Sequence, residues 1–168
     1  MSKKNGFTII ELVIYLGLLG IFLVIMTNLF VATLNVRLES QNQSALQQDG
    51  RYLIQRLTYD LRRANQINLP LLGEQTNSLD LLINDNLVDK HFIYNLNNQN
   101  LILNINDEEL ALNSKDTQVT DLVFYRLGNS DINPQSKDTV QIKFTLRSTI
   151  IKDSGQEIKS YQTTVNLR

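Results

Sequence analysis

One acidic side chain lies immediately ahead of a long uncharged segment. Glu11 follows Ile9 and Ile10, and no Asp, Glu, Lys or Arg occurs from Leu12 to Val36. A carboxylate in hydrocarbon costs on the order of 2.5–3.5 kcal/mol at the membrane centre and less near the interface. From the residues alone, two interpretations stand: Glu11 reaches the lipid headgroups and does nothing more, or it is retained for a charged partner.

Few other residues have the type and spacing that catalysis requires. The sequence has no cysteine, which excludes a thiolate nucleophile, a disulfide and a Cys-ligated zinc. His91, the only histidine, precedes Phe92 in a strand-like run, which predicts a half-exposed strand residue and not a catalytic base. Neither a Gly-x-Ser-x-Gly motif nor a phosphate-binding Gly-Lys-Thr/Ser loop occurs. We therefore predict no enzyme activity and no cofactor.

The remaining charged clusters are typical of solvated surface. Asp107 to Glu109, and the pair Asp85 and Asp89, match no calcium-binding spacing, so no metal site is predicted. The net charge is -1 and the pI about 5.8, whereas a nucleic-acid-binding surface is normally basic. Four arginines are spread around one segment, offset by Asp49 and Asp60, and predict an exposed helix face instead of a DNA contact: Arg51, Arg56, Arg62 and Arg63.

The uncharged segment has the length of a membrane-spanning helix. Leu12 to Val31 is almost entirely apolar, and its roughly 20 residues at ~1.5 Å each span about 30 Å, the thickness of a hydrocarbon core. A secretory signal peptide has an apolar core of only ~7–15 residues and a small-x-small cleavage site. Val31-Ala32-Thr33 is a poor site of that kind. The segment therefore predicts a retained membrane anchor.

The residues around Glu11 form a recognisable pattern. Gly6-Phe7-Thr8-Ile9-Ile10-Glu11 follows Lys3 and Lys4 and leads into the apolar run. It resembles the type IV prepilin signature, in which a short basic leader ends in Gly and is followed by Phe, Thr, two aliphatic residues and Glu. The resemblance extends from Lys3 to about Val36. By the positive-inside tendency, Lys3 and Lys4 hold the N-terminus in the cytoplasm and send the rest outward.

This resemblance implies a processing step and an assembly contact. A prepilin peptidase would cut between Gly6 and Phe7, and Phe7 would become an N-methylated terminus. Glu11 would then face the Phe7 ammonium of a neighbouring subunit. Because the two charges attract, this pairing would stabilise the correct register of the neighbouring helices. The implied partners are the peptidase, other pilin or pseudopilin subunits, and an inner-membrane assembly platform with its ATPase.

The apolar run departs from many major pilins in one respect. It contains no proline, and the prolines of the chain are Pro70 and Pro134. Gly17 and Gly20 are its candidate flexible points, although close helix packing explains them better.

The helical period continues beyond the apolar run. Apolar residues recur at intervals of three, four and seven and predict an amphipathic helix: Leu46, Leu53, Ile54, Leu57, Leu61 and Ala64. Gly50 weakens its middle by about 1 kcal/mol and is a candidate kink. The helix should end between Ala64 and Ile67, ahead of Pro70. The segment Gln48–Ala64 resembles the spine helix of J-type minor pseudopilins and W-type minor pilins, which implies a minor subunit.

After this helix the period changes to that of β-structure. Short runs separated by Asn, Asp, Gly and Ser predict strands at 80–83, 91–94, 100–105, 109–112, 119–127, 139–148 and 159–167, with a hairpin turn at 95–100. The expected fold class is α+β: a long N-terminal helix, half transmembrane and half amphipathic, packed on one antiparallel sheet or two small ones. The expected divisions are a leader (1–6), a transmembrane assembly helix (7–36) and an extracytoplasmic domain (37–168), whose helix ends at about 66.

The two resemblances together imply a minor pilin or pseudopilin that primes assembly or lies at the tip. The filament could be a type IV pilus, a type II secretion pseudopilus or a DNA-uptake filament. The protein would begin in the cytoplasmic membrane and later stand in a periplasmic or surface filament, without binding nucleic acid directly. A singly anchored binding or sensor domain remains an alternative and predicts an uncut N-terminus. A secreted enzyme with a long signal peptide is a third hypothesis and predicts cleavage near Ala32.

Overall fold

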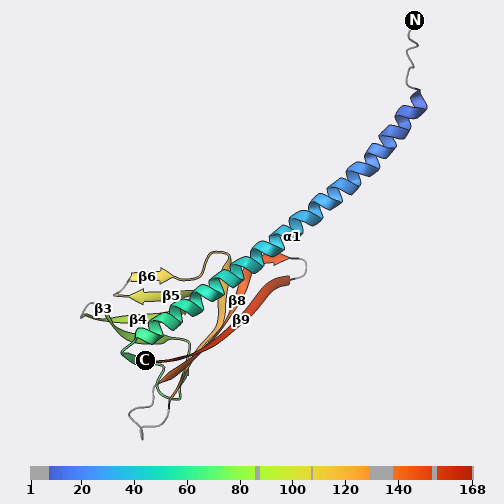
Figure 1. Cartoon of the computed structure of the whole chain (residues 1–168). Coiled ribbons are helices and arrows are strands. Elements are labelled where there is room, and N and C mark those ends of the chain that lie inside the picture. Colours follow the sequence, from blue (N-terminus) through green and yellow to red (C-terminus); the bar gives the residue numbers. More distant parts are fainter. Residues whose placement is uncertain (1–7, 86–87, 107, 129–137, 153–154, 168) are drawn as a thin grey trace. The chain divides into compact units, whose positions relative to one another are not determined.

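The computed structural model describes residues 8–85, 88–106, 108–128, 138–152 and 155–167. The chain divides into two compact units, residues 1–41 and 42–168. A single helix, α1, runs from Ile9 to Arg63, so its first part belongs to one unit and its last part to the other (Figure 1). Its end lies next to the predicted boundary, and its last turn carries Arg62 and Arg63, whose charges suit a helix C-terminus.

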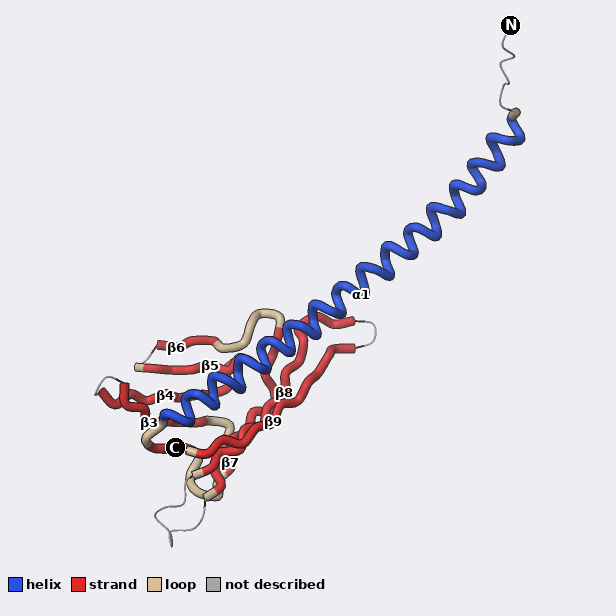
Figure 2. Tube along the Cα trace, in the orientation of Figure 1, coloured by secondary structure: helices blue, strands red, loops and turns tan. Residues whose placement is uncertain are grey.

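The described part of residues 42–168 contains two antiparallel sheets. The five-stranded sheet has the order β1-β3-β4-β5-β6, with bounds Gln66–Leu69, Leu79–Asp85, Val88–Asn97, Asn100–Ile105 and Glu108–Ala111. The four-stranded sheet has the order β2-β7-β8-β9, with bounds Gln75–Thr76, Thr117–Leu127, Thr139–Lys152 and Gly155–Asn166 (Figure 2). The α+β fold class is therefore confirmed.

All the predicted runs are strands, and two further strands were missed. β1 has four residues and β2 has two, and both lie close to Pro70 and Gly73 in a segment rich in turn residues. Strands this short give a weak periodic signal, because the four alternating residues of β1 are the minimum for recognising alternation and the two of β2 fall below it. Their pairing with β3 and β7 decides their conformation.

The hairpin between β4 and β5 is tighter than predicted. β4 continues to Asn97, which pairs with Asn100, so the turn contains only Asn98 and Gln99. Both residues have positive φ angles, 47° and 63°. Two consecutive left-handed residues are what a two-residue type I′ turn requires, and Asn is among the residues that adopt them most readily.

The core lies between the last part of α1 and the inner faces of the sheets. Leu53, Leu57 and Leu61 of α1 are fully buried. The alternation in β8 is also confirmed, because Val140 and Ile142 are buried while Lys143, the next residue, is exposed. Burying each such leucine contributes about 1.5–3 kcal/mol relative to exposure, so the apolar face of α1 is a main source of stability here.

Gly50 is a contact point between α1 and β9. α1 continues through Gly50 as one helix, and the residue is buried. A Cβ atom there would lie 2.1 Å from Cζ of Tyr161. The Tyr161 hydroxyl donates a hydrogen bond to the Leu46 carbonyl (2.7 Å), and its ring stacks on Phe144 at a centroid distance of 5.3 Å. Gly50 therefore provides room for an aromatic ring and does not interrupt the helix.

A second polar contact joins α1 to the connection between β6 and β7. Oδ2 of Asp49 accepts hydrogen bonds from the Ser114 backbone N–H (3.0 Å), the Ser114 hydroxyl (2.7 Å) and the Thr117 hydroxyl (2.5 Å). Charge-assisted hydrogen bonds of this kind are stronger than neutral ones. Asp49 therefore holds this connection against the helix.

Candidate processing and assembly site

The described part of the predicted site begins at Thr8. Lys3, Lys4, Gly6 and Phe7 lie outside the described residues, so the leader charges, the cleavage position and the methylation position stay predictions. Glu11 is described and lies in the first turn of α1.

Thr8 caps the N-terminus of α1. The hydroxyl of Thr8 accepts a hydrogen bond from the Glu11 backbone N–H (3.4 Å), and its carbonyl accepts one from the Leu12 N–H (3.3 Å). The first N–H groups of a helix have no partner within the helix, and a side-chain oxygen three residues earlier satisfies one of them. Thr8 and Glu11 have the spacing of a capping box, a signal that was present in the sequence and was missed.

The Glu11 side chain does not complete that capping box. It is partly exposed, and its Oε1 accepts a hydrogen bond from the Tyr15 hydroxyl, one turn later, at 3.4 Å. That distance is long for an O–H···O bond, so Tyr15 orients the carboxylate weakly. The positive end of the helix macrodipole favours a carboxylate in the first turn. The result is a negative charge at the start of an apolar helix, accessible to a cation.

The helix behind Glu11 exposes its apolar side chains on every side. From Leu12 to Gln41 each residue is exposed, and the most apolar 18-residue window of α1 has a mean hydropathy of 2.7. By length and composition this part of α1 can cross a membrane. The hydroxyls of Thr27 and Thr33 donate to the Leu23 and Leu29 carbonyls (2.9 and 2.8 Å), which satisfies these polar groups within the helix as lipid requires.

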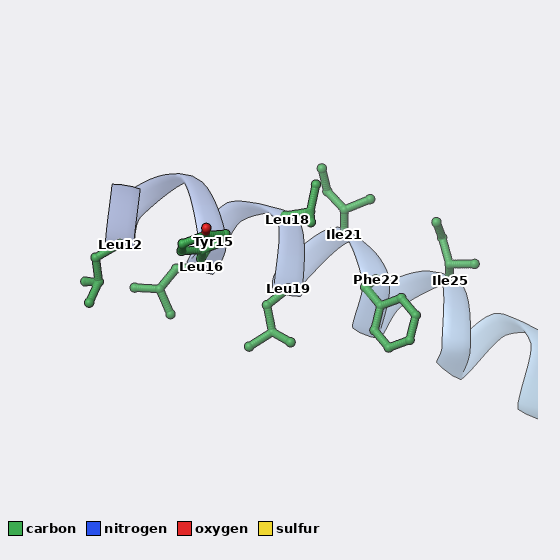
Figure 3. A pocket seen from close by; sticks show the side chains of 8 residues that line it. All are labelled: Leu12, Tyr15, Leu16, Leu18, Leu19, Ile21, Phe22 and Ile25. Carbon is green, nitrogen blue, oxygen red and sulfur yellow. The ribbon is translucent and has the colours of Figure 1, made fainter. Parts of the chain in front are cut away.

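Large side chains of this segment form a shallow hollow on the surface of the helix itself. Figure 3 shows Leu12, Leu16, Leu19 and Phe22 projecting to one side and Leu18, Ile21 and Ile25 to the other. All the lining residues belong to α1, so the hollow is the space between side chains on the surface of one helix and not an enclosed pocket. A Cβ atom added at Gly17 or Gly20 would meet nothing within 4 Å, so another helix can approach the backbone closely there.

A comparison with family models decides what this segment is. Residues 1–27 match the model of the prokaryotic N-terminal methylation motif. The chain carries the type IV prepilin-like signature. No curated protein and no solved structure matches the chain.

The match supports a type IV pilin-like protein of the kind that a prepilin peptidase processes. Assembly with other pilin subunits is what the motif implies. Pilin-like proteins with this motif are structural and not enzymatic. The long apolar helix and the α+β arrangement of the pilin-like chain agree with this assignment.

The remaining candidate sites have structural explanations. His91 lies on β4 with 56% of its side chain exposed, and its Nδ1 is 3.1 Å from Oδ1 of Asp80, as expected of a half-exposed strand residue.

Asp85 and Asp89 each have a partner within the chain. Lys90 donates a hydrogen bond to Asp85 (2.8 Å) and thereby lowers the pKa of that carboxyl. Asp89 accepts a hydrogen bond from Asn84 (2.8 Å). Asp107 lies outside the described residues, which contain no cluster of three metal-ligating side chains.

The prediction that all four arginines form an exposed helix face is wrong for two of them. Nε of Arg56 and Nε of Arg63 bind the two carboxylate oxygens of the fully buried Asp60 at 2.8 and 2.9 Å. The buried Tyr94 hydroxyl donates to the same carboxylate, and the guanidinium of Arg63 lies 4.8 Å from the centre of the Phe92 ring. Spacings of three and four residues place both cations beside Asp60, whereas Tyr94 comes from β4, which helix periodicity could not reveal.

Proposed function

We propose that this pilin-like protein is a minor pilin or minor pseudopilin. It is inserted with its N-terminus in the cytoplasm, cleaved between Gly6 and Phe7, and assembled through its apolar helix into a filament. The observation that carries the proposal is an apolar helix that is exposed from Leu12 onward. It follows Glu11, whose backbone N–H is capped by Thr8, and it lies within the matched methylation motif. Such a helix needs lipid or other helices around it, and a filament core supplies the second.

Cleavage would create the partner that Glu11 requires. The new Phe7 ammonium stays cationic after N-methylation, and a carboxylate and an ammonium at a lipid boundary are each costly when unpaired. An ion pair between Glu11 and the Phe7 ammonium of a neighbouring subunit would stabilise one axial register of the two helices relative to the others. In this proposal residues 1–6 are the leader, 7–36 the assembly helix and 37–168 the extracytoplasmic domain, with Lys3 and Lys4 fixing the orientation.

The minor role rests on the resemblance of Gln48–Ala64 to the spine helix of J-type pseudopilins and W-type minor pilins. Subunits of that kind prime assembly or occupy the tip. Type IV pili, type II secretion pseudopili and DNA-uptake filaments all use them, together with an inner-membrane platform and its ATPase. The mature protein would move from the cytoplasmic membrane to a periplasmic or surface filament.

Mass spectrometry of the mature N-terminus tests the proposal. The chain is co-expressed with a prepilin peptidase, and the expected product begins at N-methylated Phe7. Gly6→Val should abolish cleavage, because the peptidase needs close backbone approach at a residue without a side chain. Gly17→Val, outside the cleavage site, is the matched control and should be cut normally. An intact N-terminus would favour a singly anchored binding domain, and a cut near Ala32 would favour a secreted protein.

A further inference from the structure

The outer face of the four-stranded sheet carries a shallow hollow built by all four of its strands. We name it the sheet hollow, and the residues that line it are Gln75, Val123, Tyr125, Gln141, Lys143 and Gln162. It lies within residues 42–168 and shares no residue with the processing and assembly site. Figure 2 shows the long strands β7, β8 and β9 that carry most of it.

The strand register places the lining residues in two neighbouring rows. Gln75 of β2 lies opposite Tyr125, and Tyr125 lies opposite Gln141. In the next row Lys143 of β8 lies between Val123 and Gln162. Alternate residues of a strand point to the same side, so both rows face away from the core. The hollow therefore crosses the whole sheet, a width of about 14 Å for four strands at ~4.8 Å spacing.

The polar side chains of the sheet hollow are not engaged by the rest of the described chain. Within the described ranges, no residue forms a hydrogen bond or ion pair with the side chains of Gln75, Tyr125, Gln141, Lys143 or Gln162. The neighbouring outward pair behaves differently, because the hydroxyls of Thr145 and Ser160 lie 3.1 Å apart and bond to each other. The hollow thus presents donors and acceptors that a ligand can bind in place of solvent.

The chemistry of this lining suits a ligand that is rich in hydroxyl groups. Each glutamine offers one acceptor oxygen and two donor hydrogens, and a ligand hydroxyl can both donate and accept. The half-buried Tyr125 ring and Val123 add an apolar floor on which the C–H face of a sugar ring can lie. Lys143 is the only charged residue of the lining and favours an anionic substituent. One cation is too few for nucleic acid, which is held through several phosphate contacts.

We propose that the sheet hollow binds an acidic oligosaccharide, with the three glutamines bonding sugar hydroxyls and Lys143 bonding a carboxylate. This inference goes beyond filament assembly and does not depend on it. It gives residues 42–168 a ligand of their own, an acidic sugar chain that carries several hydroxyl groups.

Calorimetric titration of the full chain in nanodiscs tests the inference. The probes are tetragalacturonate and a hyaluronan tetrasaccharide, with neutral maltotetraose for comparison. An acidic probe should bind at least about tenfold more tightly than the neutral one, because a hydrogen-bonded charge contributes more than a neutral contact. Lys143→Gln should remove that preference, and Gln141→Leu should weaken both classes of sugar.

The matched control is Lys159→Gln, which removes the same charge from β9 outside the hollow and should leave affinity unchanged. Circular dichroism checks that each variant keeps its fold. Absence of saturable binding by every probe overturns the proposal. So does equal weakening by Lys143→Gln and Lys159→Gln, which would show only diffuse attraction. Tighter binding of tetraglutamate than of either acidic sugar would also overturn it and would indicate a peptide site.

Discussion

At the first turn of α1, the backbone of Glu11 has a structural role and its carboxylate has the proposed assembly role. The Thr8 hydroxyl bonds the Glu11 backbone N–H and thereby defines where the helix begins. In a complete capping box the glutamate side chain would turn back to the cap residue. Here it bonds Tyr15 instead, toward the apolar segment. The backbone of Glu11 thus stabilises the helix start while its carboxylate remains available for a neighbouring cation.

Glu11→Gln should block assembly without blocking cleavage. The substitution removes the charge but keeps the shape and an acceptor for Tyr15. An ion pair at 4 Å is worth from about 1 kcal/mol in water to about 4 kcal/mol at an effective dielectric constant near 20, so the docked state should lose a large part of its preference. The measurement is the fraction of mature protein in sheared filaments. Tyr15→Phe, which removes the 3.4 Å hydrogen bond and keeps the charge, should assemble normally; failure of both variants alike would argue against charge pairing.

Asp60→Ala should destabilise residues 42–168 strongly. It leaves two arginines without their carboxylate and a buried Tyr94 hydroxyl without its acceptor. Breaking a buried charge pair costs about 3–5 kcal/mol, and the lower end applies because Arg56 and Arg63 keep 30% and 31% of their side chains exposed. Urea denaturation gives the change in the free energy of unfolding. Arg62→Ala, on the exposed side of the same turn, should change it by less than about 0.5 kcal/mol.

Alkaline pH should weaken the fold through Tyr94. Burial, together with the neighbouring Asp60 carboxylate, raises the pKa of Tyr94 above its ordinary value. A raised pKa means that the folded state holds this proton more tightly than the unfolded state does. The contribution is therefore complete below the unfolded pKa of about 10 and declines as the pH rises above it. Urea midpoints measured between neutral and strongly alkaline pH should show this decline, and Tyr94→Phe should reduce its slope; an unchanged slope would assign the effect to other groups.

At the scale of elements, the approach of α1 to β9 depends on one missing side chain. Gly50 lets the Tyr161 ring lie directly against the helix, where its hydroxyl reaches the Leu46 carbonyl. A glycine in a helix interior normally costs about 1 kcal/mol relative to alanine. Here that cost is offset by a close helix–strand contact that no other residue would allow.

Gly50→Ala should consequently destabilise, although helix propensity alone predicts the opposite. The new Cβ would lie 2.1 Å from Tyr161 Cζ, and overpacking of this kind costs about 1–3 kcal/mol. The same substitution in a Tyr161→Leu background should be neutral or stabilising, because the ring is gone. Thermal unfolding of the four variants gives the coupling energy. A destabilisation of equal size in both backgrounds would mean that Tyr161 is not the obstacle.

At the scale of the whole molecule, the two units differ in how far their apolar side chains are buried. The core cluster draws its residues from Leu46 to Val165, all within residues 42–168. Residues before Asn42 contribute no buried side chain among those described. The C-terminal unit therefore has its own core, whereas the N-terminal segment depends on lipid or on other helices.

A fragment of residues 42–168 should fold cooperatively in detergent-free buffer. It keeps every buried apolar side chain of the core cluster, including those of the last part of α1. Gel filtration should give a monomer, and urea should unfold it in a single transition. The full chain should require detergent or nanodiscs under the same conditions. A fragment that aggregates or lacks a cooperative transition would show that the first unit is needed for folding.

Local patterns in the sequence were enough to determine several features. The apolar run and the alternation of β8 each lie in one continuous segment, so periodicity reveals them directly. The motif at Gly6–Glu11 is also continuous in the sequence, and its resemblance to a known signature identified it. The pairing of Asp60 with Tyr94, the fit of Tyr161 against Gly50 and the meeting of Gln75 with Tyr125 and Gln141 were decided only by tertiary structure. Periodicity states which face of an element is buried, whereas strand order and register select its partners. Those depend on how the whole core packs, which is why the assembly motif was visible in the sequence and the sheet hollow was not.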